Sequence, residues 1–569
     1  MTSSLVRSVP VALFVSLLSA CGGGDNPLPQ LGAATAGTLA SCASLATGFT
    51  FANTTITAAS VVAAGTLNNA GQPVGEHCLV TGHMNQRVST VDGDTYAIGF
   101  EMRMPTAWSG RFLYQGNGGI DGRVATADGS FGRVIENGLQ KGFAVISSDA
   151  GHTNAQNPLF GVDPQARLDY GYQAVGTLTP MAKALIAAAY GRGPDRSYIG
   201  GTSNGGRHTM VAASRYATEY DGFLAISPGF NLPKAAVAQL YGAQQWATVA
   251  TTTGVAPNFD LESALPQNER SLISQAILAK CDALDGAADG LVQDVEACRT
   301  AFNLARDVPT CLGPRDGTCL SAAQKTVIAN VFAGARNSAG QPLYSGWPYD
   351  PGIVHDGWAS WKFRNSVRGG RDPVAVAHIF TTPPMSTTAL ANTLDFALNF
   401  DFDVDAPKIF ATSGIYTESA MSFMTPLNPT NLDTLRERGA KMIVVHGLSD
   451  GVFSVDDTTR WFNEANQRVG GVIADAVRLF RVPGMGHSGS GPSTDQFDGL
   501  DALVAWVESG VAPDRIEATA RGAGNPAGAN GDVPVTWSAN RTRPLCPYPL
   551  VARYTGGDVE RASSFMCAM

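Results

Sequence analysis

Three residues far apart in the chain have the types, order and surroundings of a nucleophile, an acid and a base. Ser203 lies in Gly201-Thr202-Ser203-Asn204-Gly205, a G-x-S-x-G pattern, and Asp450 and His487 follow later, each just after an apolar stretch. A serine hydroxyl attacks a carbonyl carbon only when a base takes its proton, and a carboxylate must hold the tautomer of that base. The three residues therefore predict acyl transfer through nucleophilic catalysis.

The elements that must position these residues follow from the apolar pattern. Strands are predicted at 96–102, 111–115, 143–147, 197–200, 441–447 and 477–482, and helices at 176–190, 207–216 and 455–464. Strands that alternate with helices are typical of a mostly parallel sheet. A strand, a sharp turn and a helix around Ser203 are the context of a nucleophile elbow. The sequence therefore predicts an α/β fold with an α/β-hydrolase core.

Each member of the predicted triad has a rival. The G-x-S-x-G pattern can arise by chance in a chain with 64 glycines. Asp450 could instead cap a helix, with Asp456 or Asp457 as the acid, and His446 is a second candidate for the base. We favour Asp450 and His487 because both follow strands at the sheet edge where such sites form.

An oxyanion intermediate needs backbone N–H donors placed in advance. One should be the amide of Asn204, the residue after the nucleophile. The other should come from the glycine-rich stretch 115–119, which follows a predicted strand. We favour the amide of Gly119, with Gly118 as the alternative.

Length and charge limit the classes of function. A chain of 569 residues is too long for one ordinary core, so we expect an α/β core at 41–230 and 426–569 with a lid domain inserted at 231–425. The net charge is −9 and no run of Lys or Arg stands out, which argues against a nucleic-acid partner. No organic cofactor and no protein partner are implied.

The amino-terminal segment has the pattern of an export signal. Arg7 precedes an apolar run at 9–18, and Leu18-Ser19-Ala20-Cys21 resembles the bacterial lipobox. We therefore predict a signal peptide at 1–21, a flexible tether at 22–40 and attachment to a membrane through a lipid on Cys21. The protein would be a lipoprotein of the bacterial cell envelope, or secreted. The alternative is ordinary cleavage after Ala20, which leaves Cys21 as a free thiol.

Eight cysteines remain after Cys21, an even number that suggests disulfide bonds in an exported protein. The sequence alone permits 105 pairings. The simplest pairing joins consecutive cysteines: 42–78, 281–298, 311–319 and 546–567.

From about Cys42 to the carboxyl terminus the chain resembles the tannase and feruloyl esterase family. The resemblance is carried by the stretches 110–119, 200–207, 446–450 and 484–487. It implies a serine hydrolase of aromatic acid esters, with feruloyl, galloyl or small terephthalate monoesters as substrates. The alternatives are hydrolysis of aliphatic hydroxyacid esters or oligomers and a non-catalytic role as a surface binding protein.

The chain departs from the family pattern at two positions. The family usually has a cysteine just before the serine and another just after the histidine, joined across the active site. Thr202 and Ser488 stand there in this chain. We hypothesise that the two hydroxyls form a hydrogen bond in place of the disulfide.

The predicted insertion holds a stretch that resembles the calcium loop of the family, 281–291. Its carboxylates are hard oxygen ligands of the kind calcium prefers. The resemblance implies a structural Ca²⁺ bound by Asp282, Asp285 and Asp289, with backbone oxygens of Ala287 and Leu291. The alternative is a solvated acidic turn.

Substrate-contacting residues are harder to assign from the sequence. Phe453, three residues after Asp450, stands where a family member also has phenylalanine, and we expect it to line the site. Three tryptophans of the insertion, Trp347, Trp358 and Trp361, could stack on a planar acyl group. Arg368 and Arg371 could meet a substrate carboxylate.

Overall fold

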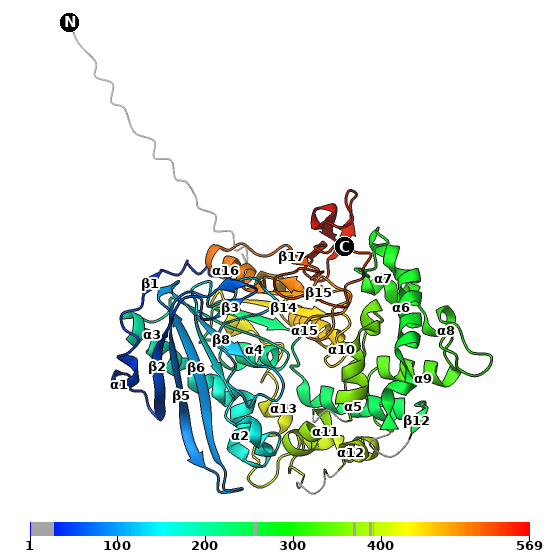
Figure 1. The fold of residues 1–569 in the computed structure, drawn as a ribbon, viewed down its shortest axis with the longest axis horizontal. Helices are drawn as coiled ribbons and strands as arrows, with labels where there is room; N and C mark the ends of the chain where they lie inside the picture. Colours follow the sequence, from blue (N-terminus) through cyan, green and yellow to red (C-terminus); the bar gives the residue numbers. More distant parts are fainter. Residues whose placement is uncertain (2–27, 254–258, 368–370, 386–389, 391) are drawn as a thin grey trace.

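A nine-stranded sheet forms the centre of the protein (Figure 1). The structure, a computed structural model, describes residues 1, 28–253, 259–367, 371–385, 390 and 392–569. The sheet order is β15-β14-β11-β10-β8-β9-β6-β5-β2. Its strands are β2 (Thr54–Val62), β5 (His77–Val88), β6 (Thr95–Pro105), β8 (Arg111–Gly116), β9 (Ala144–Ser148), β10 (Arg196–Thr202), β11 (Gly222–Ile226), β14 (Lys441–Gly447) and β15 (Val477–Val482).

The sheet is parallel in one part and antiparallel in the other. Neighbouring strands from β15 to β9 run parallel, whereas β6, β5 and β2 pair antiparallel. The predicted strand at 96–102 lies in β6, which forms a long hairpin with β5, so it is antiparallel to its neighbours. The mostly parallel sheet is confirmed, and the carboxyl ends of β10, β14 and β15 come together at one edge.

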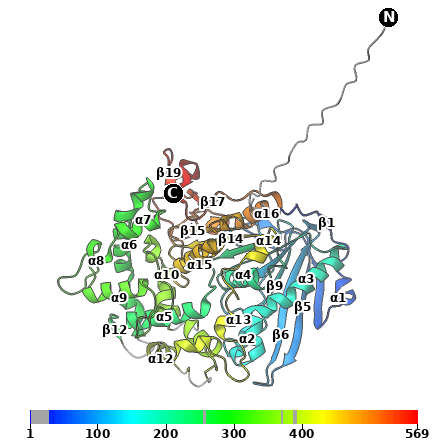
Figure 2. The same ribbon diagram turned by 180° about the vertical axis from the view of Figure 1, so that it is seen from behind.

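Both faces of the parallel part are buried. Along β14, Met442 and Val444 belong to one core cluster, while Ile443 and Val445 belong to the other. This alternation follows from the two-residue period of a strand. Helices α3 (Ala174–Tyr190), α4 (Asn204–Arg215) and α15 (Val455–Arg468) pack on the first face, and α16 (Gly499–Ser509) packs on the second. Figure 2 shows α3 across β6 and β9.

Helices fill the stretch between β11 and β14, which contains the predicted insertion 231–425 and lies beside the sheet (Figure 1). They are α5 (Leu232–Ala247), α6 (Gln267–Cys281), α7 (Val295–Ala301), α8 (Leu304–Asp307), α9 (Ala322–Phe332), α10 (Asp356–Ala359), α11 (Asp372–Ala375), α12 (Thr393–Asn399), α13 (Ala420–Phe423) and α14 (Asp433–Glu437).

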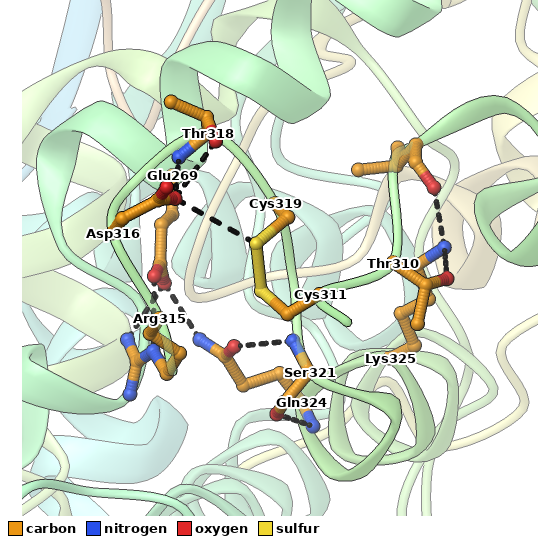
Figure 3. The surroundings of a disulfide bond; sticks show 11 residues. Glu269, Thr310, Cys311, Arg315, Asp316, Thr318, Cys319, Ser321, Gln324 and Lys325 are labelled. Carbon is orange, nitrogen blue, oxygen red and sulfur yellow. Dashed lines mark hydrogen bonds and ion pairs between the residues drawn. A yellow bond between two sulfur atoms is a disulfide. The ribbon is translucent and has the colours of Figure 1, made fainter. Parts of the chain in front are cut away.

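A disulfide loop at 311–319 is fastened to this helical stretch by a buried carboxylate (Figure 3). Glu269 of α6 accepts hydrogen bonds from Arg315 at 2.9 and 2.7 Å and from Gln324 at 2.6 Å. Gln324 also forms a capping box with Ser321 at the start of α9. One carboxylate therefore joins the loop to two helices.

The remaining elements are short. They are α1 (Leu45–Gly48), α2 (Pro164–Leu168), and the small sheets β1 (Gly37–Thr38) with β7 (Ala107–Trp108), β3 (Asn68–Asn69) with β4 (Gln72–Pro73), β12 (Thr252–Thr253) with β13 (Phe259–Asp260), β16 (Gln496–Phe497) with β17 (Ile516–Thr519) and β18 (Thr542–Leu545), and β19 (Val551–Tyr554) with β20 (Phe565–Ala568).

All four predicted disulfides are present, Cys42–Cys78, Cys281–Cys298, Cys311–Cys319 and Cys546–Cys567. The predicted signal peptide, the lipobox cysteine Cys21 and the first part of the tether lie outside the described residues. Across the part of the chain that is described, no helix combines the length and apolar character needed to cross a membrane.

Candidate active site

Ser203 occupies a sharp turn between β10 and α4. Its backbone has φ 65° and ψ −122°, a left-handed conformation that costs a residue with a side chain about 1–3 kcal/mol. Glycine is needed on both sides of the turn. A Cβ on Gly201 would lie 2.7 Å from the carbonyl oxygen of Gly116, and one on Gly205 would lie 2.2 Å from it. The end of β8 therefore passes directly beneath the serine.

The structure brings the three predicted triad residues into one hydrogen-bonded chain. Nε2 of His487 lies 2.8 Å from Oγ of Ser203, and its Nδ1 lies 2.8 Å from Oδ2 of Asp450. Asp450 is 1% exposed, whereas His487 and Ser203 are half-buried. This is the geometry in which a histidine can take the serine proton while a carboxylate holds its tautomer.

The surroundings of Asp450 keep it ionised despite its burial. Its Oδ1 accepts hydrogen bonds from the amides of Val452 and Phe453, both at 2.9 Å. Burial acts to raise the pKa of Asp450, but His487 and His446 outweigh it and hold that pKa well below its usual range. Asp450 therefore remains an anion beside the histidine.

The rival residues are engaged elsewhere. Asp456 pairs with Arg299 and Asp457 with Arg460. His446 is fully buried, with Nδ1 2.9 Å from Oγ1 of Thr458 and Nε2 3.3 Å from Oδ2 of Asp450. His446 and His487 thus reach the same oxygen of the Asp450 carboxylate.

Two backbone segments meet beside Ser203 where an oxyanion would form. Asn204 is the first residue of α4, so its amide has no acceptor within the helix. Across the turn, a Cβ built on Gly118 would lie 3.8 Å from Cβ of Ser203. Gly119 follows with φ 73°. Of the two glycines named from the sequence, Gly118 borders the serine, and Gly119 is the next residue in the chain.

Two aromatic rings enclose the histidine. Trp361 and Phe453 each lie edge-on to His487, with ring centroids 5.2 Å away. Trp347 and Trp358 are instead packed within the helical stretch, where the ammonium group of Lys362 lies over the Trp347 ring. Of the three tryptophans considered from the sequence, Trp361 reaches the site.

Arg371 lies beside the oxyanion segment. A Cβ on Gly119 would come 2.7 Å from Nη1 of Arg371, so the guanidinium covers the backbone of that glycine. Arg371 and Arg123 line a cavity of about 410 Å³ that also borders Asn117 and Asp121. The other arginine considered, Arg368, lies outside the described residues.

Thr202 and Ser488 line one shared cavity of about 590 Å³ instead of forming the hypothesised hydrogen bond. Within the described chain, no hydrogen bond joins the two hydroxyls; the Ser488 amide instead donates to Oγ of Ser227 at 3.3 Å. The hypothesis did not foresee the left-handed backbone of Ser488, which has φ 64° and turns its amide toward Ser227.

The acidic loop forms internal hydrogen bonds. Asp282 accepts from the amides of Asp289 and Gly290 at 3.0 Å, and Asp289 pairs with Arg543. In the described ranges no group of three His, Cys, Asp or Glu side chains is arranged to hold a metal. Oδ2 of Asp285 is nevertheless buried without a described hydrogen-bond partner. A bound cation would give this oxygen a partner, and carboxylate oxygens are ligands that calcium prefers.

Two residues of the site have no motif that could have identified them in advance. Gly229 leaves room for the Phe453 ring, which would lie 2.3 Å from a Cβ at that position. His355 comes from the helical stretch and approaches the loop that holds His487, where a Cβ on Gly486 would lie 2.3 Å from its ring. Both contacts join segments distant in sequence.

Comparison with known proteins supports the same reading of the fold. The model of the family described as "Tannase and feruloyl esterase" matches residues 78–568. The chain belongs to this family. As a tannase and feruloyl esterase family member it is a carboxylic ester hydrolase.

Family relatives cover most of the chain. Mono(2-hydroxyethyl) terephthalate hydrolase of Piscinibacter sakaiensis is 40% identical over 87% of this chain and 85% of its own length. A probable feruloyl esterase of Arthroderma benhamiae is 28% identical over 84% of this chain and 83% of its own length. Feruloyl esterase B from Aspergillus oryzae matches with a TM-score of 0.70 at 22% identity, covering 93% of this chain and 99% of that one. The fold is thus an α/β-hydrolase with insertions.

Proposed function

We propose that this family member hydrolyses esters of aromatic acids through an acyl-enzyme on Ser203. The observation that carries the proposal is a pair of hydrogen bonds, each 2.8 Å long, that connects Ser203 to His487 and His487 to Asp450. That arrangement activates a serine hydroxyl at neutral pH.

The reaction follows from the positions of these groups. His487 Nε2 takes the proton of Ser203 as Oγ forms a bond to the ester carbonyl carbon. The amides of Asn204 and Gly119, or of Gly118 in its place, hold the oxyanion. The bond to the alcohol then breaks, and the alcohol leaves with the proton from His487. Water attacks the acyl-enzyme by the same route, which releases the acid and restores Ser203.

An aromatic acyl group suits the walls of the site. The rings of Trp361 and Phe453 stand beside His487, where the acyl group must lie during attack. The relatives act, by their names, on feruloyl and terephthalate esters. We propose feruloyl, galloyl or terephthalate monoesters, with Arg371 meeting a free carboxylate of the last class.

We propose that the stretch 231–425 is the lid domain and that it holds a structural Ca²⁺. The ligands would be carboxylates of Asp282, Asp285 and Asp289 with backbone oxygens of Ala287 and Leu291. The ion would stabilise the loop against the carboxyl-terminal segment, where Arg541 already donates to the carbonyl of Asp289 at 2.6 Å.

Four disulfides support export to an oxidising compartment. We propose that Cys21 carries the lipid that attaches the protein to the cell envelope. Metabolic labelling with a fatty acid in the native host tests this, since Cys21→Ala should abolish the label.

A substrate panel tests the catalytic proposal. The protein without residues 1–21 is assayed on p-nitrophenyl acetate, methyl ferulate, methyl gallate, mono(2-hydroxyethyl) terephthalate and a 3-hydroxybutyrate ester, beside Ser203→Ala. We expect turnover of one aromatic ester well above the acetate, lost in the alanine variant. Equal activity in Ser203→Ala would refute the assignment of the nucleophile. Turnover of the 3-hydroxybutyrate ester alone would refute the aromatic class.

A further inference from the structure

A buried polar network joins the two backbone segments that border Ser203. Nδ2 of Asn204 donates to Oδ2 of Asp121 at 2.8 Å, and Oδ1 of Asn204 accepts from Nε of Arg207 at 2.6 Å. Nε2 of His208 lies 2.8 Å from the same oxygen of Asp121. None of these four side chains is more than 9% exposed. Water therefore offers little substitute for these hydrogen bonds.

The protonation states make the network complementary. Burial and the charge of Arg207 hold the pKa of His208 well below its usual value, so the ring is neutral. Its Nε2–H then donates to Asp121, and its Nδ1 accepts from Nη2 of Arg207 at 3.1 Å. The other donors of Arg207 reach the carbonyls of Gly171 at 2.6 Å and Tyr170 at 3.0 Å. Asp121 accepts both hydrogen bonds on one oxygen, although burial raises the pKa of its carboxyl well above the usual value and Arg207 acts against that rise.

The place of this network in the chain gives it a consequence for catalysis. Asp121 lies two residues after Gly119, and Asn204 directly follows Ser203. The side-chain bond between them therefore fixes the spacing of the two segments whose amides would hold the oxyanion. Oxyanion donors act only within about 2.7–3.1 Å of the developing charge, so a small change in this spacing weakens catalysis.

We propose that Asn204 and Asp121 are positioning residues that set the geometry of the oxyanion site through their side chains. This inference rests on the proposed function. It concerns the side chain of Asn204, which the proposed mechanism does not use, and it gives the buried Asp121, Arg207 and His208 a role in that mechanism.

A swap of the two side chains tests the proposal. Asn204→Asp alone sets two carboxylates against each other, and Asp121→Asn alone leaves Arg207 without the carboxylate of its network. In the double variant the amide introduced at position 121 donates to the carboxylate introduced at position 204. That carboxylate also accepts from Arg207. The charge and the hydrogen bond between positions 121 and 204 are restored, but His208, which shares one oxygen of Asp121 with Asn204 in the native network, then faces the amide nitrogen.

We expect kcat for the best aromatic ester to fall about 10- to 100-fold in each single variant, with KM changed less than about threefold. The double variant should recover part of kcat, because the link between positions 121 and 204 is rebuilt. The affinity for an arylboronic acid, which forms a tetrahedral adduct on Ser203, should fall and recover in parallel. Thr209→Val, which removes a neighbouring hydrogen bond to Gly205 on α4, is the matched control and should keep its kcat.

The outcomes separate this inference from the proposed function. Loss of activity in Ser203→Ala with unchanged kcat in both single variants would overturn the positioning role alone. A folded double variant no better than the single ones would overturn it too. If the two single variants fail to fold because they change the buried charge, Asn204→Ser is used instead. It removes the hydrogen bond to Asp121 without a change of charge, and the same loss in kcat and boronate affinity is expected. Activity retained in Ser203→Ala would overturn the proposed function itself.

Discussion

Trp361 makes a T-shaped contact with the imidazole of His487, at 5.2 Å between centroids and 83° between planes. Phe453, which follows β14, does the same at 81°. The histidine is thus held between an aromatic residue of the core and one of the helical stretch. Displacement of that stretch would remove one wall of the site.

Trp361→Ala should lower kcat/KM for the best aromatic ester about tenfold, because edge contacts between aromatic rings contribute about 0.5–1.5 kcal/mol beyond area burial. Trp361→Phe is the control and should lose less. Steady-state assays on the aromatic ester and on p-nitrophenyl acetate check this. An equal loss on both substrates would contradict an acyl-binding role.

Arg371→Ala should raise KM for mono(2-hydroxyethyl) terephthalate about tenfold, the effect of one lost charge-assisted hydrogen bond. KM for the uncharged methyl ferulate should stay the same. Arg133→Ala, in the other cavity, is the control because it removes an equal charge away from Gly119. Equal effects of the two substitutions would show that only general electrostatic attraction matters.

His152 should make the fold sensitive to mild acid. It is fully buried, stacks on Phe160 at 3.6 Å and lies 2.8 Å from the carbonyl oxygen of Ile120. Burial lowers its pKa to about 4. Because the unfolded chain then binds a proton more readily than the folded one, stability should fall as pH falls from about 6.5 to about 4.

Urea unfolding at pH 7 and pH 5 checks this expectation. His152→Gln should reduce the loss of unfolding free energy between these pH values by about 2 kcal/mol. An unchanged pH dependence would mean that His152 does not titrate in this range.

Chelation of calcium should lower the melting temperature by about 2 °C, as expected when a ligand present at about 100 times its Kd is removed from a protein of this length. Added Ca²⁺ should restore the original value. Asp285→Asn should melt at the lower temperature with or without the ion. A melting temperature that changes with neither chelator nor added Ca²⁺ would refute the metal site.

The double substitution Thr202→Cys with Ser488→Cys should produce a fifth disulfide, because both residues line one cavity. Thiol titration should find no free cysteine in the oxidised double variant, against one in each single variant. The unfolding temperature should rise on oxidation. Two free thiols in the double variant would show that the loops stand too far apart.

Local sequence patterns predicted the parts of the molecule whose geometry is local. The turn at Ser203 follows from a strand and a helix adjoining two glycines, and each disulfide joins two cysteines that are consecutive in the sequence after Cys21. The α4 helix begins at Asn204, three residues before the predicted 207, because the elbow turns directly into the helix.

Contacts between distant segments could not be predicted in this way. The bond between Asn204 and Asp121, and the approach of Arg371 to Gly119, depend on how the strands and the helical stretch pack. The antiparallel direction of β6 was also not predicted. The apolar pattern of one strand does not indicate whether its neighbours in the sheet run parallel or antiparallel to it. The role of Asp285 as a metal ligand stays a prediction.

The spacing of the disulfides bears on the order in which the protein matures. In every pair the second cysteine is the next one along the chain, and the widest separation is 36 residues. With Cys21 blocked by the proposed lipid, each remaining thiol of a chain that enters an oxidising compartment amino terminus first meets its correct partner before any competitor emerges. Oxidation in order of arrival thus yields the native set directly, and no later reshuffling by an isomerase is required.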